Sequence, residues 1–235
     1  MRIALCLSGQ ARSVKQGYEF VHKNLLKDND VKVFIHAWSG EEVNSAIELY
    51  NPERYKTDPA LTNDLSKYTN VPPPQPNWKV KDPARSTWNQ LNAVYQCNKL
   101  KSMYESDNNM KFDWVIRSRF DFALNTTIDF KHLDNNKLYI PNCRMTPARD
   151  FGNDQFAFSS SENMDKYSDT YNHLDRFYDS GIQMMCEDMM SANWKQHNLI
   201  GENLVYCNIN HPFPPGQYNG TWHSLVREDF EKWLR

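Results

Sequence analysis

Glycine is scarce in this sequence, with 8 residues among 235, which is about half of the roughly 7% that is usual in proteins. So low a content excludes collagen-like chains and glycine-rich linkers. The spacing of the eight glycines matches neither the dinucleotide-binding motif GxGxxG nor the phosphate-binding motif GxxxxGK[ST]. If the protein binds a phosphate group, residues other than those of a glycine-rich loop must hold it.

Long apolar runs and closely spaced cysteines are also missing. No stretch approaches the roughly 18 apolar residues of a membrane span, and the apolar run Ile3–Leu7 is too short for the core of a signal peptide. The five cysteines are odd in number, widely spaced and without a CxxC pair: Cys6, Cys97, Cys143, Cys186 and Cys207. This pattern is typical of reduced cysteines. We therefore expect a cytoplasmic protein without a membrane span.

A strong charge of either sign is absent as well. Lys and Arg number 27 against 29 Asp and Glu, which gives a formal net charge of −2. This balance does not favour a nucleic-acid partner. Hydrophobic residues make up 40% and aromatic residues 13% of the chain, enough for one sizeable core. We expect a single globular domain over residues 1–235.

The order of the apolar segments predicts an α/β fold. An apolar run at 3–7 leads through a polar turn and a predicted helix at 14–26 to a second run at 31–35, which is the spacing of a βαβ unit and predicts a parallel sheet. The clearest strand spans 114–120. Shorter strands are predicted at 137–141, 155–158 and 204–209, and helices at 84–105, 165–178 and 184–196. Residues 51–83 give a weak pattern, with a proline-rich surface loop at 72–76.

The predicted helix at 84–105 carries apolar residues at helical spacing. The stripe that we expect it to bury consists of Leu91, Val94, Tyr95, Leu100, Met103 and Tyr104.

Two arginines and an aspartate alternate along the strand at 114–120 and its end. Side chains two residues apart share one face of a strand, so Arg117, Arg119 and Asp121 are expected on the same side. Burying guanidinium groups requires anionic partners. One interpretation is internal pairing with Asp121 and a neighbouring carboxylate. The other puts the arginines at the ligand-binding edge of the sheet, where they bind phosphate and Asp121 binds a divalent metal.

The turn Ser8–Ser13 follows the first strand and precedes a helix. Its backbone N–H groups and Arg12 are placed to meet an anion at the helix N-terminus. The alternative is an ordinary capped helix, with Ser8 or Ser13 as the N-cap. His36 and Trp38 end the second strand at the same edge, and each of them alone fits a packing role better than a contact with a ligand.

Asp154 lies in a polar turn that enters a predicted strand. A carboxylate at the edge of a sheet can act as a general base, although an aspartate in a turn often bonds its own backbone. Glu187, Asp188 and Glu202 compete for this role. His223, near the end of the chain, is a candidate metal ligand.

Taken in order, several segments resemble a family of small glycosyltransferases from giant viruses, phages, algae and bacteria. They cover most of the chain, although residues 39–83 carry no motif of the family. The matching segments are Ser8-Gly9-Gln10-Ala11-Arg12, Val33-Phe34-Ile35-His36-Ala37-Trp38, Trp88-Asn89-Gln90, Phe112–Asp121 and Asn153-Asp154-Gln155-Phe156-Ala157-Phe158.

The resemblance implies a GT-A fold, which is a Rossmann-like α/β domain that binds a nucleotide-diphosphosugar donor and usually a divalent cation (Mn²⁺ or Mg²⁺). The acceptor is then a hydroxyl of a glycan, polysaccharide or glycoprotein. The residues expected to contact the donor are Ser8, Gly9, Gln10, Arg12, His36, Gln90, Arg117 and Arg119. Asp154 is the expected catalytic base, and Asp121 and His223 are the expected metal ligands.

The sequence departs from the GT-A pattern at one point. Most GT-A enzymes carry Asp-x-Asp, whereas this chain has Asp121-Phe122-Ala123. The missing carboxylate shifts more of the diphosphate charge onto Arg117 and Arg119. It also keeps open a second hypothesis, a catalytically inactive module that binds a sugar nucleotide or a glycan. A third class, a nucleotide-dependent hydrolase or nucleotidyltransferase, is less favoured because the chain lacks a phosphate-binding glycine loop.

Overall fold

One seven-stranded sheet, in the order β3-β2-β1-β4-β6-β5-β7, forms the centre of the protein. The computed structural model describes residues 1–73, 82–141 and 154–207. Within them, the β4–β6 and β6–β5 pairs are antiparallel and the other neighbours are parallel. The strands are β1 (Ile3–Gln10), β2 (Val31–Trp38), β3 (Arg54–Asp58), β4 (Trp114–Ser118), β5 (Leu138–Pro141), β6 (Phe156–Ser159) and β7 (Leu204–Cys207).

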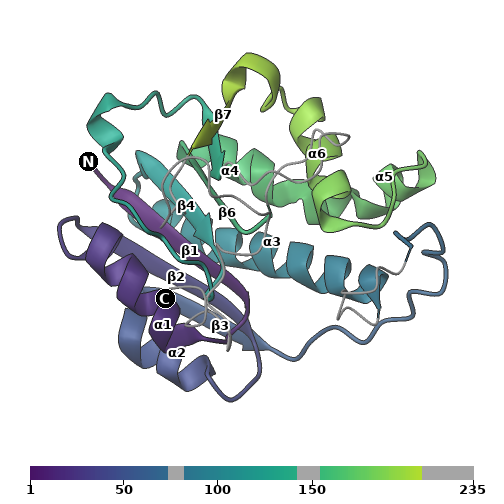
Figure 1. Ribbon diagram of the computed structural model, residues 1–235, viewed down its shortest axis with the longest axis horizontal. Helices are drawn as coiled ribbons and strands as arrows, with labels where there is room; N and C mark the ends of the chain where they lie inside the picture. Colours follow the sequence, from purple (N-terminus) through teal and green to yellow (C-terminus); the bar gives the residue numbers. More distant parts are fainter. Residues whose placement is uncertain (74–81, 142–153, 208–235) are drawn as a thin grey trace, which may run out of the picture.

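Helices cover both faces of the sheet (Figure 1). On one face lie α1 (Val14–Val21), which continues as a short π-helix (His22–Leu26), and α2 (Val43–Tyr50). On the other lie α3 (Pro83–Asp107), α4 (Ser161–Ser168), α5 (Leu174–Asp179) and α6 (Cys186–Gln196). Short 3₁₀ turns occupy Phe130–His132, Asp169–His173 and Gly201–Asn203. None of the helices in these ranges has both the length and the apolar character needed to cross a bilayer.

The strand β1 is buried on both faces because it lies between β2 and β4. Its side chains alternate between the two cores: Leu5 and Leu7 pack toward α1 and α2, whereas Ala4 and Cys6 pack toward α3. This burial explains why the first apolar run of the sequence does not alternate with polar residues. The predicted α/β fold with a mainly parallel sheet flanked by helices is confirmed.

Several predicted element boundaries need correction. The first strand does not stop at 7 but continues through Ser8 to Gln10, because these residues still pair with His36–Trp38 of β2. The predicted strand at 114–120 ends at Ser118, where a turn begins and brings the Phe122 N–H to the Arg119 carbonyl at 3.4 Å. The strand β3 lies in the segment 51–83, for which the sequence pattern is weak, and the helix α2 just before it was not predicted.

The buried face of α3 also differs from the predicted stripe. Met103 is 51% exposed, whereas Cys97, Lys101 and Glu105 are buried. Lys101 and Glu105 are charged, so a prediction based on apolar residues alone misses them. The predicted buried face is therefore rotated about the helix axis relative to the observed one. The three cysteines whose side chains are described, Cys6, Cys97 and Cys186, are buried free thiols.

The helix α1 contacts the turn after β4 at Gly17. A Cβ atom at this position would lie 1.8 Å from the carbonyl oxygen of Phe120, so one of the two backbones would have to move. Gly17→Ala is therefore expected to lower the free energy of unfolding by at least about 2 kcal/mol, measured by urea denaturation. Gly40→Ala is the matched control, because the nearest atom to its Cβ would be the Trp38 carbonyl oxygen at 3.8 Å. Equal effects of the two substitutions would contradict the close approach at Gly17.

Candidate active site

The carboxyl ends of β1, β2 and β4 meet at one edge of the sheet, because these three strands run parallel. Open α/β sheets bind ligands at this edge. Ser8 of β1 lies beside His36 of β2, and Arg117 of β4 lies beside Cys6 of β1. Ser8, His36 and Arg117 therefore share the face that α3 covers. The segments after β1 and β4 and the one before β6 supply the other candidate residues.

Asp121 lies between two arginines. Its Oδ2 atom accepts from Arg12 Nε at 2.8 Å, and Arg119 donates from Nε to Oδ1 and from Nη2 to Oδ2, both at 2.8 Å. Burial raises the pKa of the Asp121 carboxyl, but the charges and hydrogen bonds of Arg119 and Arg12 outweigh burial and bring this pKa below its ordinary value. Asp121 is therefore ionised with both oxygens engaged, which confirms internal pairing for Arg119.

Arg117 is buried at 2% exposure and has no carboxylate partner among the described residues. Its Nη1 donates to the main-chain carbonyl of Asp154, and its Nε has no hydrogen-bond partner in the same part of the chain. Arg117 does not pair with Asp121, because the turn after Ser118 directs Asp121 to Arg12 and Arg119 instead. A buried guanidinium without an anion is costly, which makes Arg117 a candidate anion-binding group.

Asp154 is buried and is linked to α3. Gln90 donates from Nε2 to its Oδ2 atom, so within the described residues the carboxylate contacts another element rather than its own turn. The main chain here is tied to the end of β4, because the Arg119 N–H donates to the Gln155 carbonyl at 3.1 Å. Two segments that the sequence separates, 88–90 and 154–158, thus meet through the contact between Gln90 and Asp154.

Glu187 lies in the first turn of α6, where the negative charge of Asp154 acts on it. Burial, together with the negative charge of Asp154, raises the pKa of Glu187 to about 8. At neutral pH its carboxyl group is thus mostly protonated. Of the other competing acids, Asp188 also lies in this first turn, and Glu202 lies in an exposed 3₁₀ turn.

Three buried polar atoms on this edge have no hydrogen-bond partner among the described residues: Ser8 Oγ, His36 Nδ1 and Trp38 Nε1. The other nitrogen of His36, Nε2, lies 2.9 Å from Asp58 Oδ2 on β3. Burial lowers the pKa of His36 more than Asp58 raises it, so the ring is neutral at pH 7. A neutral ring that donates from Nε2 to Asp58 leaves Nδ1 as an acceptor. Buried polar atoms without partners are uncommon and indicate a position for water or a ligand.

The N-terminus of α1 is closed by a carboxylate from elsewhere in the chain. The N–H groups of Ser13 and Val14 donate to Glu42 Oε1 at 2.9 Å and to Oε2 at 2.8 Å. Of the two serines considered as the N-cap, Ser13 occupies that position but its side chain makes no capping bond, and Ser8 lies in β1. These two N–H groups already have an internal partner, which leaves Arg12 as the anion-binding group of this turn.

Two further residues of this turn were predicted to contact the donor. Gly9 adopts φ +108°, a backbone conformation that glycine adopts readily. Gln10 is exposed and accepts from Arg12 Nη1 at 3.4 Å.

The expected divalent cation stays a prediction. His223 lies outside the described residues, as do Gly152 and Asn153. Both oxygens of Asp121 face guanidinium groups, which repel an approaching cation. Within the described ranges, no three His, Cys, Asp or Glu side chains are grouped to hold a metal ion. The described residues around Asp121 therefore do not fit a metal site.

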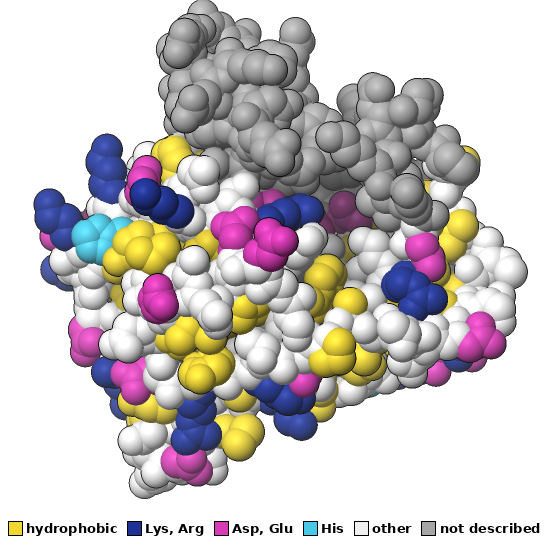
Figure 2. Space-filling view, turned by 90° about the horizontal axis from the view of Figure 1, so that it is seen from below, with side chains coloured by type: hydrophobic (Ala, Val, Ile, Leu, Met, Phe, Trp, Pro, Cys, Tyr) yellow, Lys and Arg dark blue, Asp and Glu magenta, His cyan; other side chains and the backbone are white. Residues whose placement is uncertain are grey.

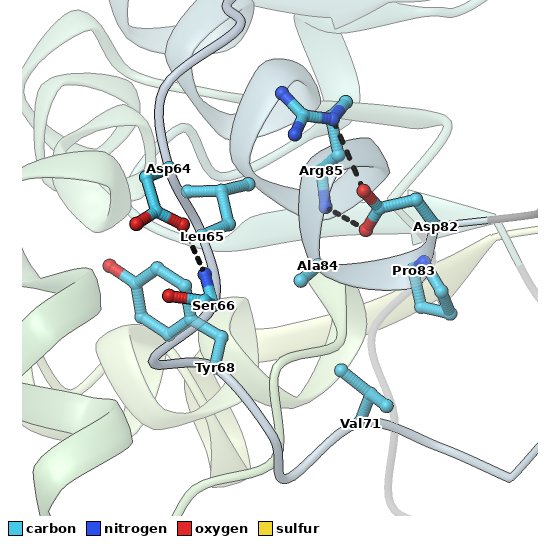
Figure 3. A pocket seen from close by; sticks show the side chains of 9 residues that line it. All are labelled: Asp64, Leu65, Ser66, Tyr68, Val71, Asp82, Pro83, Ala84 and Arg85. Carbon is cyan, nitrogen blue, oxygen red and sulfur yellow. Dashed lines mark hydrogen bonds and ion pairs between the residues drawn. The ribbon is translucent and has the colours of Figure 1, made fainter.

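A separate cavity of about 400 Å³ lies at the amino end of α3 (Figure 3). It is lined by Asp64, Leu65, Ser66, Tyr68, Val71, Asp82, Pro83, Ala84 and Arg85. Its charged groups are bonded locally: Asp82 accepts from Arg85 Nε at 3.1 Å, and Asp64 accepts from the Ser66 N–H at 2.9 Å. None of the motif residues lines this cavity, so the sheet edge is the stronger candidate for an active site.

The surface charge fits the balanced composition. On the face seen in Figure 2, basic and acidic side chains lie among one another, and the coloured residues form no broad area of one sign. The part of this face that the structure describes therefore carries no extended basic surface.

Two contacts of this edge involve residues that the sequence did not indicate. Glu42 caps α1, and Asp58 holds His36. A signal for Glu42 existed, since Val43, Ala46 and Tyr50 follow it at helical spacing and are buried. Nothing in the local sequence indicates that Asp58 reaches His36.

A scan against protein-family models finds no match to this chain, and a search of curated proteins finds none either. Its function is therefore inferred from the motifs and from the geometry of their residues.

Proposed function

We propose that this chain is a glycosyltransferase with a GT-A fold, which moves a sugar from a nucleotide-diphosphosugar to an acceptor hydroxyl of a glycan, polysaccharide or glycoprotein. The supporting observation is the convergence of Arg12, Arg117 and Arg119 with the carboxylate of Asp154 at the carboxyl edge of a mainly parallel sheet. These residues come from three separate segments of the chain. In sugar transfer with inversion, cations stabilise the leaving diphosphate and a general base removes the proton of the acceptor hydroxyl.

The proposed reaction breaks the bond between the anomeric carbon of the sugar and a diphosphate oxygen. The diphosphate leaves with the electron pair, and the guanidinium groups stabilise the developing negative charge. The acceptor oxygen forms the new bond to the anomeric carbon and gives its proton to Asp154. The hydrogen bond from Gln90 to Oδ2 orients this carboxylate.

Asp154 suits the role of base better than Glu187. The pKa of Glu187 is raised to about 8 by burial and by the charge of Asp154, so Glu187 already carries a proton at neutral pH. A protonated carboxyl group cannot accept a second proton from the acceptor. Because Glu187 is protonated, it adds no second negative charge near Asp154.

A second candidate is a catalytically inactive module that binds a sugar nucleotide. The observation that favours it is the engagement of both Asp121 oxygens by arginines, together with Ala123 in place of the second acidic residue of Asp-x-Asp. In that case the arginines bind the diphosphate and no sugar is transferred.

A panel of nucleotide-diphosphosugars incubated without an acceptor, with and without Mn²⁺, separates the two candidates. A transferase is expected to hydrolyse one donor slowly and to raise its melting temperature in the presence of that donor, because a ligand that binds only the folded state stabilises it. Selective stabilisation without hydrolysis indicates the binding module. If no donor is hydrolysed and none stabilises the protein, both candidates fail.

A further inference from the structure

The charges around Asp121 decide whether this position attracts a metal ion or an anion. It accepts three contacts of 2.8 Å from two guanidinium groups, so one negative charge is shared by two positive charges. The three side chains together carry a net charge of +1. A divalent cation is repelled by such a group, whereas an anion is attracted to it.

The two arginines are not held equally. Arg119 forms a fork with Asp121 through two nitrogens, and its side chain is 18% exposed. Arg12 contacts Asp121 through Nε alone, and its side chain is 41% exposed. A fork of two parallel bonds fixes a guanidinium more firmly than a single contact does. Arg12 is therefore the partner that can leave Asp121 with the smaller loss.

Arg117 provides an independent indication that an anion binds beside these residues. It is buried at 2% exposure without a carboxylate partner in the described part of the chain, and its Nε is unpaired there. Arg117 and Arg119 flank the same segment, because Arg117 donates to the Asp154 carbonyl and the Arg119 N–H donates to the Gln155 carbonyl.

We propose that Asp121 is an internal counter-ion rather than a metal ligand: it holds Arg12 and Arg119 in the free protein, and a bound diphosphate takes Arg12 from it. The diphosphate is then neutralised by Arg12, Arg117 and Arg119 without a metal at Asp121. This inference rests on the proposed function, since it assumes that a diphosphate binds at this edge. No covalent bond changes in the exchange.

The two roles of Asp121 predict opposite results for Asp121→Asn. A counter-ion competes with the diphosphate and repels it, so Asn is expected to tighten the binding of inorganic pyrophosphate in EDTA by about three- to thirtyfold. A metal ligand would behave in the reverse way: pyrophosphate would bind only with Mg²⁺ or Mn²⁺, and Asn would abolish this binding. Isothermal titration calorimetry of pyrophosphate, with EDTA and with MgCl₂, measures both.

Arg12→Gln supplies a second measurement that does not depend on how well Asp121→Asn folds. Because Arg12 is partly exposed, the variant should fold, and its affinity for pyrophosphate in EDTA should fall about tenfold or more. Arg2→Gln is the matched control: Arg2 is also a partly exposed arginine paired with an aspartate, Asp113, but it lies at the other end of β1. Its affinity should be unchanged.

Three results would overturn the proposal: binding that requires the metal and is lost in Asp121→Asn, no binding of pyrophosphate under either condition, or no effect of Arg12→Gln. These failures are distinguishable from failure of the proposed function. If pyrophosphate binds as expected but no donor is hydrolysed, the transferase proposal fails and the counter-ion role stands. If transfer occurs only with metal and is lost in Asp121→Asn, the transferase proposal stands and the counter-ion role fails.

Discussion

Asp154→Asn is expected to reduce the rate of sugar transfer by about 10²- to 10⁴-fold, with little change in donor binding. Asn keeps the shape of the side chain and still accepts a hydrogen bond from Gln90, but it cannot take the proton of the acceptor hydroxyl. The measurement is the initial rate of transfer at saturating donor, together with the melting temperature with and without donor.

The control for this prediction is Asp175→Asn. Asp175 is exposed and contacts Lys67 and Tyr68, away from the sheet edge, so the same change of chemistry there should leave the rate unchanged. If Asp154→Asn retains transfer within a few-fold of the wild-type rate while its melting temperature is normal, Asp154 is not the base. The next residue to test would then be Glu187.

Glu105→Gln is expected to cost about 3–5 kcal/mol of unfolding free energy. Glu105 is 1% exposed, and its carboxylate accepts from Lys101 Nζ at 3.2 Å, Lys111 Nζ at 2.8 Å, the Phe112 N–H at 3.0 Å and Ser161 Oγ at 2.6 Å. Lys101 is fully buried, and the substitution removes one of the two carboxylates that balance its charge, the other being Asp165. Urea denaturation at neutral pH measures the loss.

The loss should depend on pH in a defined direction. Burial raises the pKa of Glu105, but the hydrogen bonds from Lys111, Ser161 and Phe112, with the charge of Lys101, outweigh it and lower the pKa below its ordinary value. The stabilisation is therefore fully present above the unfolded-state pKa of about 4.3 and is lost as the pH falls through the folded-state pKa. The difference between wild type and variant should shrink in acid.

Glu162→Gln is the matched control for this buried network. Glu162 is 81% exposed and pairs with Lys166 one helical turn away at 2.8 Å, and exposed ion pairs of this kind contribute about 0.3–0.5 kcal/mol. If the two substitutions cost the same, the burial of Lys101 and Glu105 does not govern stability here.

The central strands could be predicted from the sequence because strands that are buried on both faces are rich in consecutive apolar residues. β1 begins with the continuous apolar run Ile3–Leu7, β2 and β4 are mostly apolar, and the spacing of the first two strands indicated a parallel sheet. β3 has no such run, since it is a five-residue edge strand, Arg54–Asp58, whose middle residues are exposed. Helix α2 carries a readable pattern, but the residues around it offered no motif to support it.

The sequence indicated which residues belong to the candidate site, but it did not indicate most of the contacts between them. The spacing of Arg117, Arg119 and Asp121 indicated arginines beside a carboxylate, although a turn rather than a strand brings Asp121 back to Arg119. The contact between Arg12 and Asp121 spans 109 residues, and the one between Gln90 and Asp154 spans 64. Contacts over such distances are determined by the order of the strands, which local patterns do not specify.

The position of β1 in the sheet has a consequence during synthesis of the chain. β1 pairs with β2 on one side, but its other neighbour is β4, which begins only at Trp114. At roughly 5–20 residues per second, the ribosome completes β1 and β2 several seconds before β4 emerges. During that interval one edge of β1 presents unpaired backbone groups beside the apolar side chains of Ile3–Leu7, and exposed edges of this kind pair readily with other chains. The nascent protein is therefore most prone to aggregate before β4 appears, and a chaperone that holds its first sixty or so residues would act at that stage.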